Sequence, residues 1–265
     1  MSERDLGIDT TVPHIARVYD YWLGGKDNFA VDRETAEKVI AAFPDVLISV
    51  RAQREFLGRA VRYLVDEAGI RQFLDIGTGL PAADNTHEVS QRLAPETRVV
   101  YVDNDPIVLS HARALLTSSP EGQTAYLSAD FHQPEKIIAE AAKTLDFSQP
   151  VAVMMLGLLH CVPDADDPAA LVRQVLAEVA PGSFLVIAHP AKDISSSEMG
   201  TSMRAYNESS PLQLTPRSYA EVARFFDGLE LVEPGLVQLH RWRAAAPEVG
   251  GDRELANYGG VARKS

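Results

Sequence analysis

The chain has 265 residues, of which 46% are hydrophobic and 23% are charged, and its formal net charge is −12. This length and apolar content are enough to bury a substantial core, in one large domain or two small ones. Nucleic-acid surfaces normally carry a basic stripe, so the acidic balance disfavours DNA or RNA as a partner. The single cysteine, Cys161, rules out an internal disulfide and favours a reducing, cytoplasmic location. No apolar run approaches the roughly 20 residues of a membrane span, and residues 1–10 lack the layout of a signal peptide.

The first 70 residues are expected to form a helical N-terminal extension that caps the rest of the chain. Ile15, Val18, Tyr19 and Trp22 recur at helical spacing, and a pair of glycines follows them. The same periodicity predicts helices over 32–42 and 46–67. The expected division is a cap over residues 1–70, a core over 71–243 and a tail over 244–265 that packs on the core.

From residue 71 the apolar pattern changes to short strands that alternate with helices. Strands are predicted over 71–76, 98–103, 124–129, 151–157 and 183–189, and helices over 82–93, 105–118, 134–144 and 167–180. This alternation is typical of βαβ units in a parallel sheet with helices on both faces.

The second half of the chain is expected to complete this sheet. A polar stretch at 195–211 is predicted to be a long loop, which is usually a lid, a binding loop or a disordered segment. A helix over 215–227 then precedes strands at 229–232 and 236–242, whose short Pro-Gly connection predicts an antiparallel hairpin. The fold class is therefore α/β, with a Rossmann-like seven-stranded sheet that is mostly parallel and has its last strand reversed.

The most informative segment is Phe73-Leu-Asp-Ile-Gly-Thr-Gly-Leu-Pro-Ala82, a strand that ends in an acid and a glycine turn. Two more predicted strands end in Asp103 and Asp130, so parallel pairing would place three acids around one crevice, where ligands bind in open α/β sheets. Asp75 would repel a pyrophosphate, whereas S-adenosylmethionine carries an ammonium and a sulfonium and no phosphate. Coulomb attraction in a partly dry cleft is worth a few kcal/mol, so the acids favour S-adenosylmethionine.

Other interpretations of these residues stay open at this stage. The spacing of Gly77, Gly79 and Ala82 also fits the dinucleotide fingerprint, which leaves an NAD(P)-dependent oxidoreductase as an alternative. A protein that binds S-adenosylmethionine or S-adenosylhomocysteine without catalysis is a second alternative. A strand-end acid can also cap the following helix, and Asp130 can belong to a simple turn.

Several longer motifs resemble those of one bacterial S-adenosyl methyltransferase family, within the class I methyltransferases. They are Ala16-Arg-Val-Tyr-Asp-Tyr-Trp-Leu-Gly-Gly-Lys-Asp-Asn-Phe29, Leu74-Asp-Ile-Gly-Thr-Gly-Leu-Pro81, Asn85-Thr-His-Glu-Val89, Tyr101-Val-Asp-Asn-Asp-Pro106, Leu159-His-Cys-Val-Pro-Asp164 and Tyr258-Gly-Gly-Val-Ala-Arg-Lys264. The resemblance covers nearly the whole chain and implies S-adenosylmethionine as cofactor and S-adenosylhomocysteine as product. One departure is Pro81, which stands where the family's glycine loop has a third glycine.

The resemblance also implies roles for individual residues. Gly77 and Gly79 would lie under the methionine moiety, with Asp75 near its ammonium. Asp103 would accept hydrogen bonds from the ribose hydroxyls. The remaining cofactor contacts implied are Asn104 beside the ribose, Asp130 and Phe131 at the adenine, and Tyr19, Tyr21, Lys26 and Asn28 from the N-terminal block.

His160 follows the fourth predicted strand and is the candidate catalytic residue. Its place at the mouth of the crevice suits a general base for a substrate hydroxyl or amine, although it can equally hydrogen-bond the loop and do no chemistry. The histidines lack metal-ligand spacing, so no metal is predicted. The sequence thus predicts methyl transfer from S-adenosylmethionine to an unidentified small-molecule acceptor.

Overall fold

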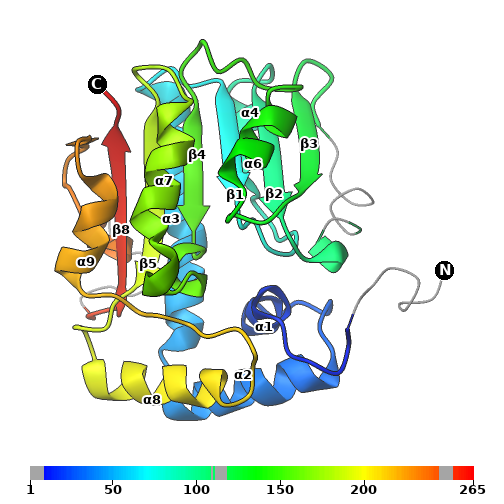
Figure 1. Ribbon diagram of the computed structural model, residues 1–265, viewed down its shortest axis with the longest axis vertical. Coiled ribbons are helices and arrows are strands. Elements are labelled where there is room, and N and C mark those ends of the chain that lie inside the picture. The colour runs from blue at the N-terminus through cyan, green and yellow to red at the C-terminus, as the bar shows by residue number, and fades with distance from the viewer. Residues whose placement is uncertain (1–8, 109, 111–117, 245–252) are drawn as a thin grey trace.

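The computed structural model describes residues 9–108, 110, 118–244 and 253–265, built around one eight-stranded sheet (Figure 1). The strand order is β3-β2-β1-β4-β5-β8-β6, with β7 also paired to β8. The parallel strands are β1 (Gln72–Ile76), β2 (Arg98–Asp103), β3 (Gln123–Ser128), β4 (Ala152–Leu156) and β5 (Phe184–Pro190). The strand order changes direction between β1 and β4, and this switch point is where ligands bind in open α/β sheets.

The reversed strand is β8 (Asn257–Arg263), which runs antiparallel to β5. Its other edge pairs with β6 (Glu230–Leu231) near one end and with β7 (Val237–Gln238) near the other. Because β6 and β7 share that edge, the sheet has seven positions across. The predicted fold class, with its reversed last strand, is confirmed.

The predicted hairpin between 229–232 and 236–242 is wrong. Both segments pair with β8 rather than with each other, because β8 from the tail lies between them and β5. The tail is therefore not merely packed on the core at 257–263. It supplies a buried strand of the sheet, with residues Asn257 to Ala262 all buried.

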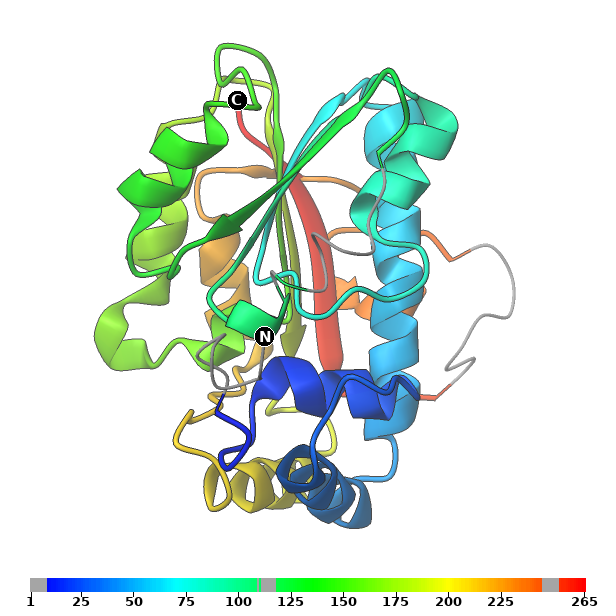
Figure 2. The ribbon, with the colours of Figure 1, turned by 90° about the vertical axis from the view of Figure 1, so that its right-hand side faces the viewer.

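Helices cover both faces of the sheet (Figure 2). One face packs against α3 (Val46–Asp66) and α4 (Thr86–Leu93), whose apolar sides meet alternate residues of the strands, such as Phe73 and Val99. The opposite face packs against α6 (Pro134–Ala141), α7 (Pro168–Ala177) and α9 (Tyr219–Ala223). Both faces are buried, so the parallel strands are nearly continuous apolar runs.

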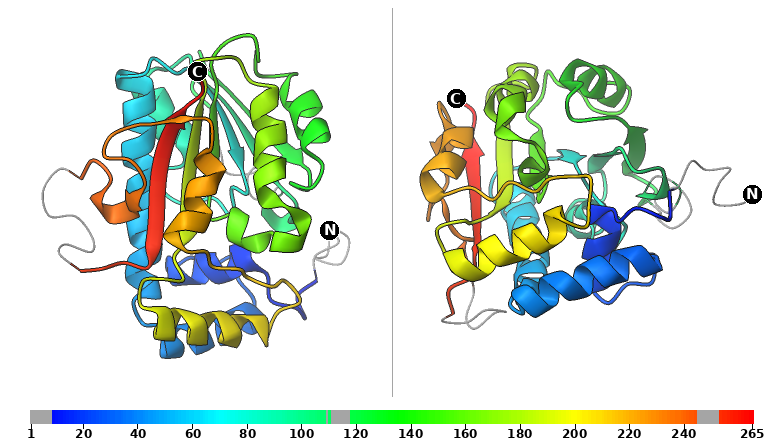
Figure 3. Two further views of the ribbon diagram at one scale, coloured as in Figure 1. Left: turned by 60° about the vertical axis from the view of Figure 1, so that its left-hand side comes forward. Right: turned by 60° about the horizontal axis from the view of Figure 1, so that its bottom comes forward.

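Three helices lie across the carboxyl ends of the parallel strands: α1 (Ile15–Trp22), α2 (Ala30–Ala42) and α8 (Ser196–Asn207) (Figures 1 and 3). The expectation of a long loop at 195–211 is wrong, because most of it is α8. This helix buries Met199 and Tyr206 in the same apolar cluster as Val39 of α2. Its exposed face is polar and its buried side includes the polar residue Ser202, so the helical period was hard to see in the sequence.

Short 3-10 turns connect several elements: η2 (Leu159–Cys161), η3 (Asp164–Asp166), η4 (Arg224–Phe226) and η5 (Leu239–Arg241). The helix expected over 105–118 falls largely outside the described residues. Among those residues, no helix combines the length and the apolar character needed to cross a lipid bilayer.

The helix expected over 82–93 begins only at Thr86, after Pro81 and a short loop. Asn85 caps it, since the backbone N–H of Asn85 donates to Glu88 at 2.8 Å. Arg54 of α3 holds the loop by donating to the carbonyl oxygens of Ala83, at 2.7 Å, and Asp84, at 2.9 Å.

Candidate active site

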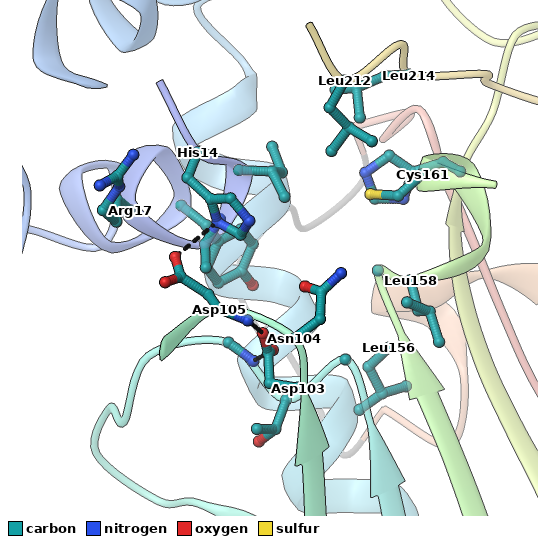
Figure 4. A pocket seen from close by; sticks show the side chains of 18 of the residues that line it. His14, Arg17, Asp103, Asn104, Asp105, Leu156, Leu158, Cys161, Leu212 and Leu214 are labelled. Atoms are coloured by element: carbon teal, nitrogen blue, oxygen red, sulfur yellow. Dashed lines mark hydrogen bonds and ion pairs between the residues drawn. The ribbon is translucent and has the colours of Figure 1, made fainter. Parts of the chain in front are cut away.

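A cavity of about 780 Å³ lies at the carboxyl ends of the parallel strands, beneath the cap helices (Figure 4). Its lining combines two kinds of surface. The strand ends contribute polar residues and glycine turns, whereas α1, α2, α3 and α8 contribute mostly apolar side chains. A cavity of this size falls in the range of roughly 300–1,000 Å³ that is typical of small-molecule sites.

The end of β1 presents Asp75 and the glycine turn to this cavity. The hydroxyl of Thr86 donates to Asp75 Oδ2 at 2.6 Å, and burial raises the pKa of Asp75 to about 6. Gly77 and Gly79 both have positive φ, at 73° and 67°, a conformation that favours glycine. Gly79 lines the cavity, and a Cβ added to it would meet no atom within 4 Å, so the space beside its backbone is open.

The end of β2 presents Asp103, Asn104 and Asp105 in sequence along the wall (Figure 4). Asp103 accepts hydrogen bonds at 2.9 Å from the backbone N–H of Gly79 and from that of Asp105. Burial raises the pKa of Asp103. Asp105 Oδ2 in turn lies 3.0 Å from Nδ1 of His14, which precedes α1, so this contact links the segment before α1 to the end of β2.

The end of β3 contributes Asp130, buried Phe131 and half-exposed His132. Partial burial alone would raise the pKa of Asp130, but hydrogen bonds from the backbone and the ring of His132 lower it below its usual value. The ring of His132 also reaches Asp166 at 3.2 Å. The prediction that the three strand-end acids line one crevice matches the geometry, since Asp75, Asp103 and Asp130 all line the cavity.

The end of β4 leads through Gly157 and Leu158 into η2, which carries His160 and Cys161. Burial lowers the pKa of His160 to about 4, with the nearby Arg217 guanidinium as a second cause, so the imidazole is neutral at pH 7. Burial raises the pKa of the Cys161 thiol to about 12, which keeps it protonated. Both residues line the cavity.

Arg217 holds this turn in place. Its guanidinium donates to the carbonyl oxygens of Leu159 and Val162, at 2.7 and 2.8 Å, and to the carboxylate of Asp164, at 2.7 and 3.0 Å. Arg217 is itself buried, and it lies within 3.0 Å of His189 Nε2. Its contacts therefore fix the segment on which His160 stands.

Buried polar atoms without a hydrogen-bond partner gather around the cavity. Of the ten such side-chain atoms found among the described residues, six belong to residues that line it. Four of the six also lack an ion pair: Ser49 Oγ, Arg54 Nε, Asn85 Nδ2 and His160 Nδ1. Since buried polar groups are normally hydrogen-bonded, this concentration is typical of a site that a polar ligand completes.

The model of the family described as S-adenosyl methyltransferase matches residues 1–265 of the chain. The chain belongs to this family. The methyltransferase is 45% identical to a DUF574 family protein from Streptomyces avermitilis MA-4680, over 97% of this chain and 99% of that one, with a TM-score of 0.94. It is 40% identical to a candidate methyltransferase from Thermobifida fusca YX, over 98% and 97% of the two chains, with a TM-score of 0.89.

More distant structures share the fold alone. Human N-acetylserotonin methyltransferase in complex with S-adenosylmethionine is 14% identical, with a TM-score of 0.50, over 99% of this chain and 65% of that one. No curated protein matches the chain. The family makes the protein a methyltransferase whose cofactor is S-adenosylmethionine. The acid rim, the open face of Gly79 and the orphaned polar atoms fit that cationic cofactor.

The N-terminal residues expected to touch the cofactor separate into two groups. Tyr19 lines the cavity, and its hydroxyl donates to the carbonyl of Val50 at 3.2 Å. Tyr21, Lys26 and Asn28 do not line it. Tyr21 instead donates to a glutamate of α2, and Lys26 is exposed.

The glycine-rich turn after α1 is built around Asp20. Its carboxylate accepts from the side chain of Asn28 at 2.8 Å and from the backbone of Asp27 at 3.0 Å. A Cβ on Gly25 would overlap the same carboxylate, which explains the glycine at that position. The N-terminal motif thus shapes the turn that follows α1.

Sequence reasoning did not single out His14, Ser49, Arg54 or Asp105, which all line the cavity. Asp105 stands two residues after Asp103 in the same motif, so its spacing was a usable signal. His14 precedes α1, and Ser49 and Arg54 lie on α3, where a single polar residue in an apolar pattern resembles ordinary surface. Their position at the cavity follows only from how the cap packs on the sheet.

Proposed function

We propose that this protein transfers the methyl group of S-adenosylmethionine to a small-molecule acceptor held between the strand ends and the cap. The observation that carries the proposal is the two-sided cavity, in which an acidic rim faces an apolar roof made by α1, α2 and α8. A roof of three helices leaves room for a small acceptor rather than a folded macromolecule. The net charge of −12 also disfavours a nucleic-acid substrate.

The residues at the strand ends suit the parts of the cofactor. Asp75 would hold the ammonium of its methionine moiety, and the unpartnered Nε of Arg54 would hold the carboxylate. Asp103 would accept from the ribose hydroxyls with the lone pairs that Gly79 and Asp105 leave free.

The residues that would contact the ribose and the adenine follow from their places along the cavity wall. Asn104 would lie beside the ribose, Asp130 would accept from the adenine amino group, and Phe131 would lie against the ring. Tyr19 would contact the cofactor from the N-terminal block, because it lines the cavity, whereas Tyr21, Lys26 and Asn28 lie outside the lining.

When bound, the cofactor supplies an electrophilic methyl group on its sulfonium. The chain's own contribution is then to position the acceptor and exclude water, which can lower a barrier by roughly 7–11 kcal/mol. His160 is proposed as the general base. Its Nδ1 is buried without a partner, and burial, which lowers the pKa of the ring to about 4, keeps the imidazole neutral at pH 7.

Calorimetric titration with S-adenosylmethionine, S-adenosylhomocysteine and NADH tests the cofactor. We expect both adenosyl ligands to bind and NADH not to, with Asp103→Asn weakening the adenosyl ligands by about 1–3 kcal/mol as a charge-assisted hydrogen bond is lost. Tight binding of NADH alone would support the oxidoreductase alternative instead.

The role of His160 as general base is tested by measuring how fast S-adenosylhomocysteine is released when the protein is given small compounds that carry a hydroxyl or an amine. His160→Gln should keep its cofactor affinity and lose roughly 10²–10⁴ in rate. The matched control is His240→Gln, since His240 is also buried but does not line the cavity. Cofactor binding without turnover of any compound would favour the non-catalytic alternative.

A further inference from the structure

The cap end of the cavity forms an apolar pocket beyond the strand ends, which we call the acceptor chamber. Its walls include Trp22, Phe43, Val50, Met199, Leu212 and Leu214. These residues come from α1, from the residue that directly follows α2, from α3, from α8 and from the segment that follows α8. Figure 4 shows Leu212 and Leu214 beside Cys161, on the opposite side of the pocket from His14 and Arg17.

Apart from Arg54 of α3, which is assigned above to the carboxylate of the cofactor, the described residues of the elements that form the acceptor chamber bring no unpaired charge to the cavity. Among the described residues, no Asp, Glu, Lys or Arg of α2, α8 or 211–214 lines the cavity. Arg17 of α1 does line it, but its Nε lies 3.3 Å from Asp32, and its guanidinium donates to the backbone oxygens of Asp9 and Val12. The acids of the cavity gather at the strand ends instead.

Two neutral residues that line the cavity, Ser49 and His160, each carry a buried polar atom without a hydrogen-bond partner among the described residues. These atoms are Ser49 Oγ and His160 Nδ1. The backbone N–H of Thr215 donates to the carbonyl of His160 at 2.7 Å, so the chamber wall that carries Leu212 and Leu214 is fastened to the proposed base.

We propose that the acceptor is a neutral, predominantly apolar ring compound that presents a phenol-type hydroxyl to His160, a proposal that rests on the function proposed above. An ionic acceptor would lose its hydration without gaining a partner in the chamber. A hydroxyl on the acceptor, in contrast, would give a hydrogen-bond partner to one of the two unpartnered atoms, Ser49 Oγ or His160 Nδ1. The acceptor oxygen bonds to the methyl carbon as the carbon–sulfur bond breaks; the electron pair of that bond stays on sulfur, and the hydroxyl proton passes to His160.

Two matched probes test the chemistry of the chamber: β-naphthol and hydroxynaphthoate, which adds a carboxylate to the same ring system. Binding of each is measured by calorimetry to the full chain saturated with S-adenosylhomocysteine. We expect β-naphthol to bind at least tenfold more tightly. With S-adenosylmethionine in its place, β-naphthol should yield its methyl ether, and His160→Gln should abolish most of that product.

Two variants place a carboxylate in the chamber wall, Leu212→Asp and Met203→Glu, both at half-buried positions. Each should weaken β-naphthol at least tenfold while the affinity for S-adenosylhomocysteine stays within twofold. The control is Leu93→Asp, at a residue that is 42% exposed and outside the cavity. Thermal melting confirms that each variant folds, and the second chamber variant replaces the first if it does not.

The outcomes separate this inference from the proposed function. If the adenosyl ligands bind but hydroxynaphthoate matches β-naphthol, the neutral-acceptor proposal is overturned and the cofactor assignment stands. The neutral-acceptor proposal is likewise overturned if neither chamber variant weakens β-naphthol, or if the wild-type chain fails to bind it. If the adenosyl ligands themselves do not bind, the proposed function fails first.

Discussion

The raised pKa of Asp75 predicts that cofactor affinity depends on pH. With a pKa of about 6 in the free protein, this carboxyl is ionised to about 90% at pH 7 and to about 10% at pH 5. An ammonium binds the ionised form, so binding must first remove the proton at low pH. The affinity for S-adenosylmethionine should therefore fall about tenfold between pH 7 and pH 5, or about 1.4 kcal/mol.

The affinity falls at low pH, rather than rising, because of how the two protonation states of Asp75 respond to the ligand. Desolvation favours the neutral carboxyl in the free site, and a bound cation favours the carboxylate, so binding lowers the pKa of Asp75 and releases a proton. The α-amino group of the ligand stays charged throughout this window, because such groups titrate above pH 7. Release should approach about one proton per ligand below pH 6 and vanish above pH 7.

The assay is calorimetric titration in two buffers of different ionisation enthalpy, across pH 5 to 7. Asp75→Asn is the control, because it keeps the shape of the side chain but cannot titrate. It should bind more weakly and lose the tenfold dependence that Asp75 contributes. Asp103, whose pKa is also raised, remains in that variant, so the difference between the two proteins isolates Asp75. An unchanged pH slope in Asp75→Asn would refute the assignment.

Three further predictions concern stability, each measured by denaturant unfolding. Gly77→Ala should lower the free energy of unfolding by about 2–4 kcal/mol, because φ is positive and the new Cβ would lie 2.8 Å from the side chain of Leu158. Gly79→Ala should lower it by only about 1–2 kcal/mol, because only the positive φ opposes the new side chain, and equal losses in the two variants would contradict this. Arg217→Met should cost about 3 kcal/mol, because two buried carbonyl oxygens lose their donor, and a loss below 1 kcal/mol would count against that account. Gly259→Val should destabilise β8 by about 3 kcal/mol or more, as its Cβ would lie 2.7 Å from Leu239, and a wild-type midpoint would show that the strand tolerates the side chain.

The polar half of the site was predictable because its signals are local. An apolar strand that ends in Asp75 and turns at Gly77 and Gly79 is contiguous, and parallel pairing alone brings Asp103 and Asp130 to the same edge. The alternation of strand and helix likewise predicted the sheet and the helices on its faces. These features depend on steric contacts between residues close in sequence and on the burial of one periodic face, and both can be recognised in short stretches of chain.

The reversed strand and the acceptor chamber were decided by tertiary structure. β8 contains Gly259 and Gly260, which pack closely against Leu239 and Phe226, so its sequence lacks the β-branched pattern of a strand and its pairing comes from β5. The chamber is assembled from side chains of helices and a segment far apart in the chain, and each of its apolar residues, taken alone, looks like ordinary core. What the sequence determined was which groups end each strand; what packing decided was which surfaces close over them, because contacts between distant segments leave no local period to detect.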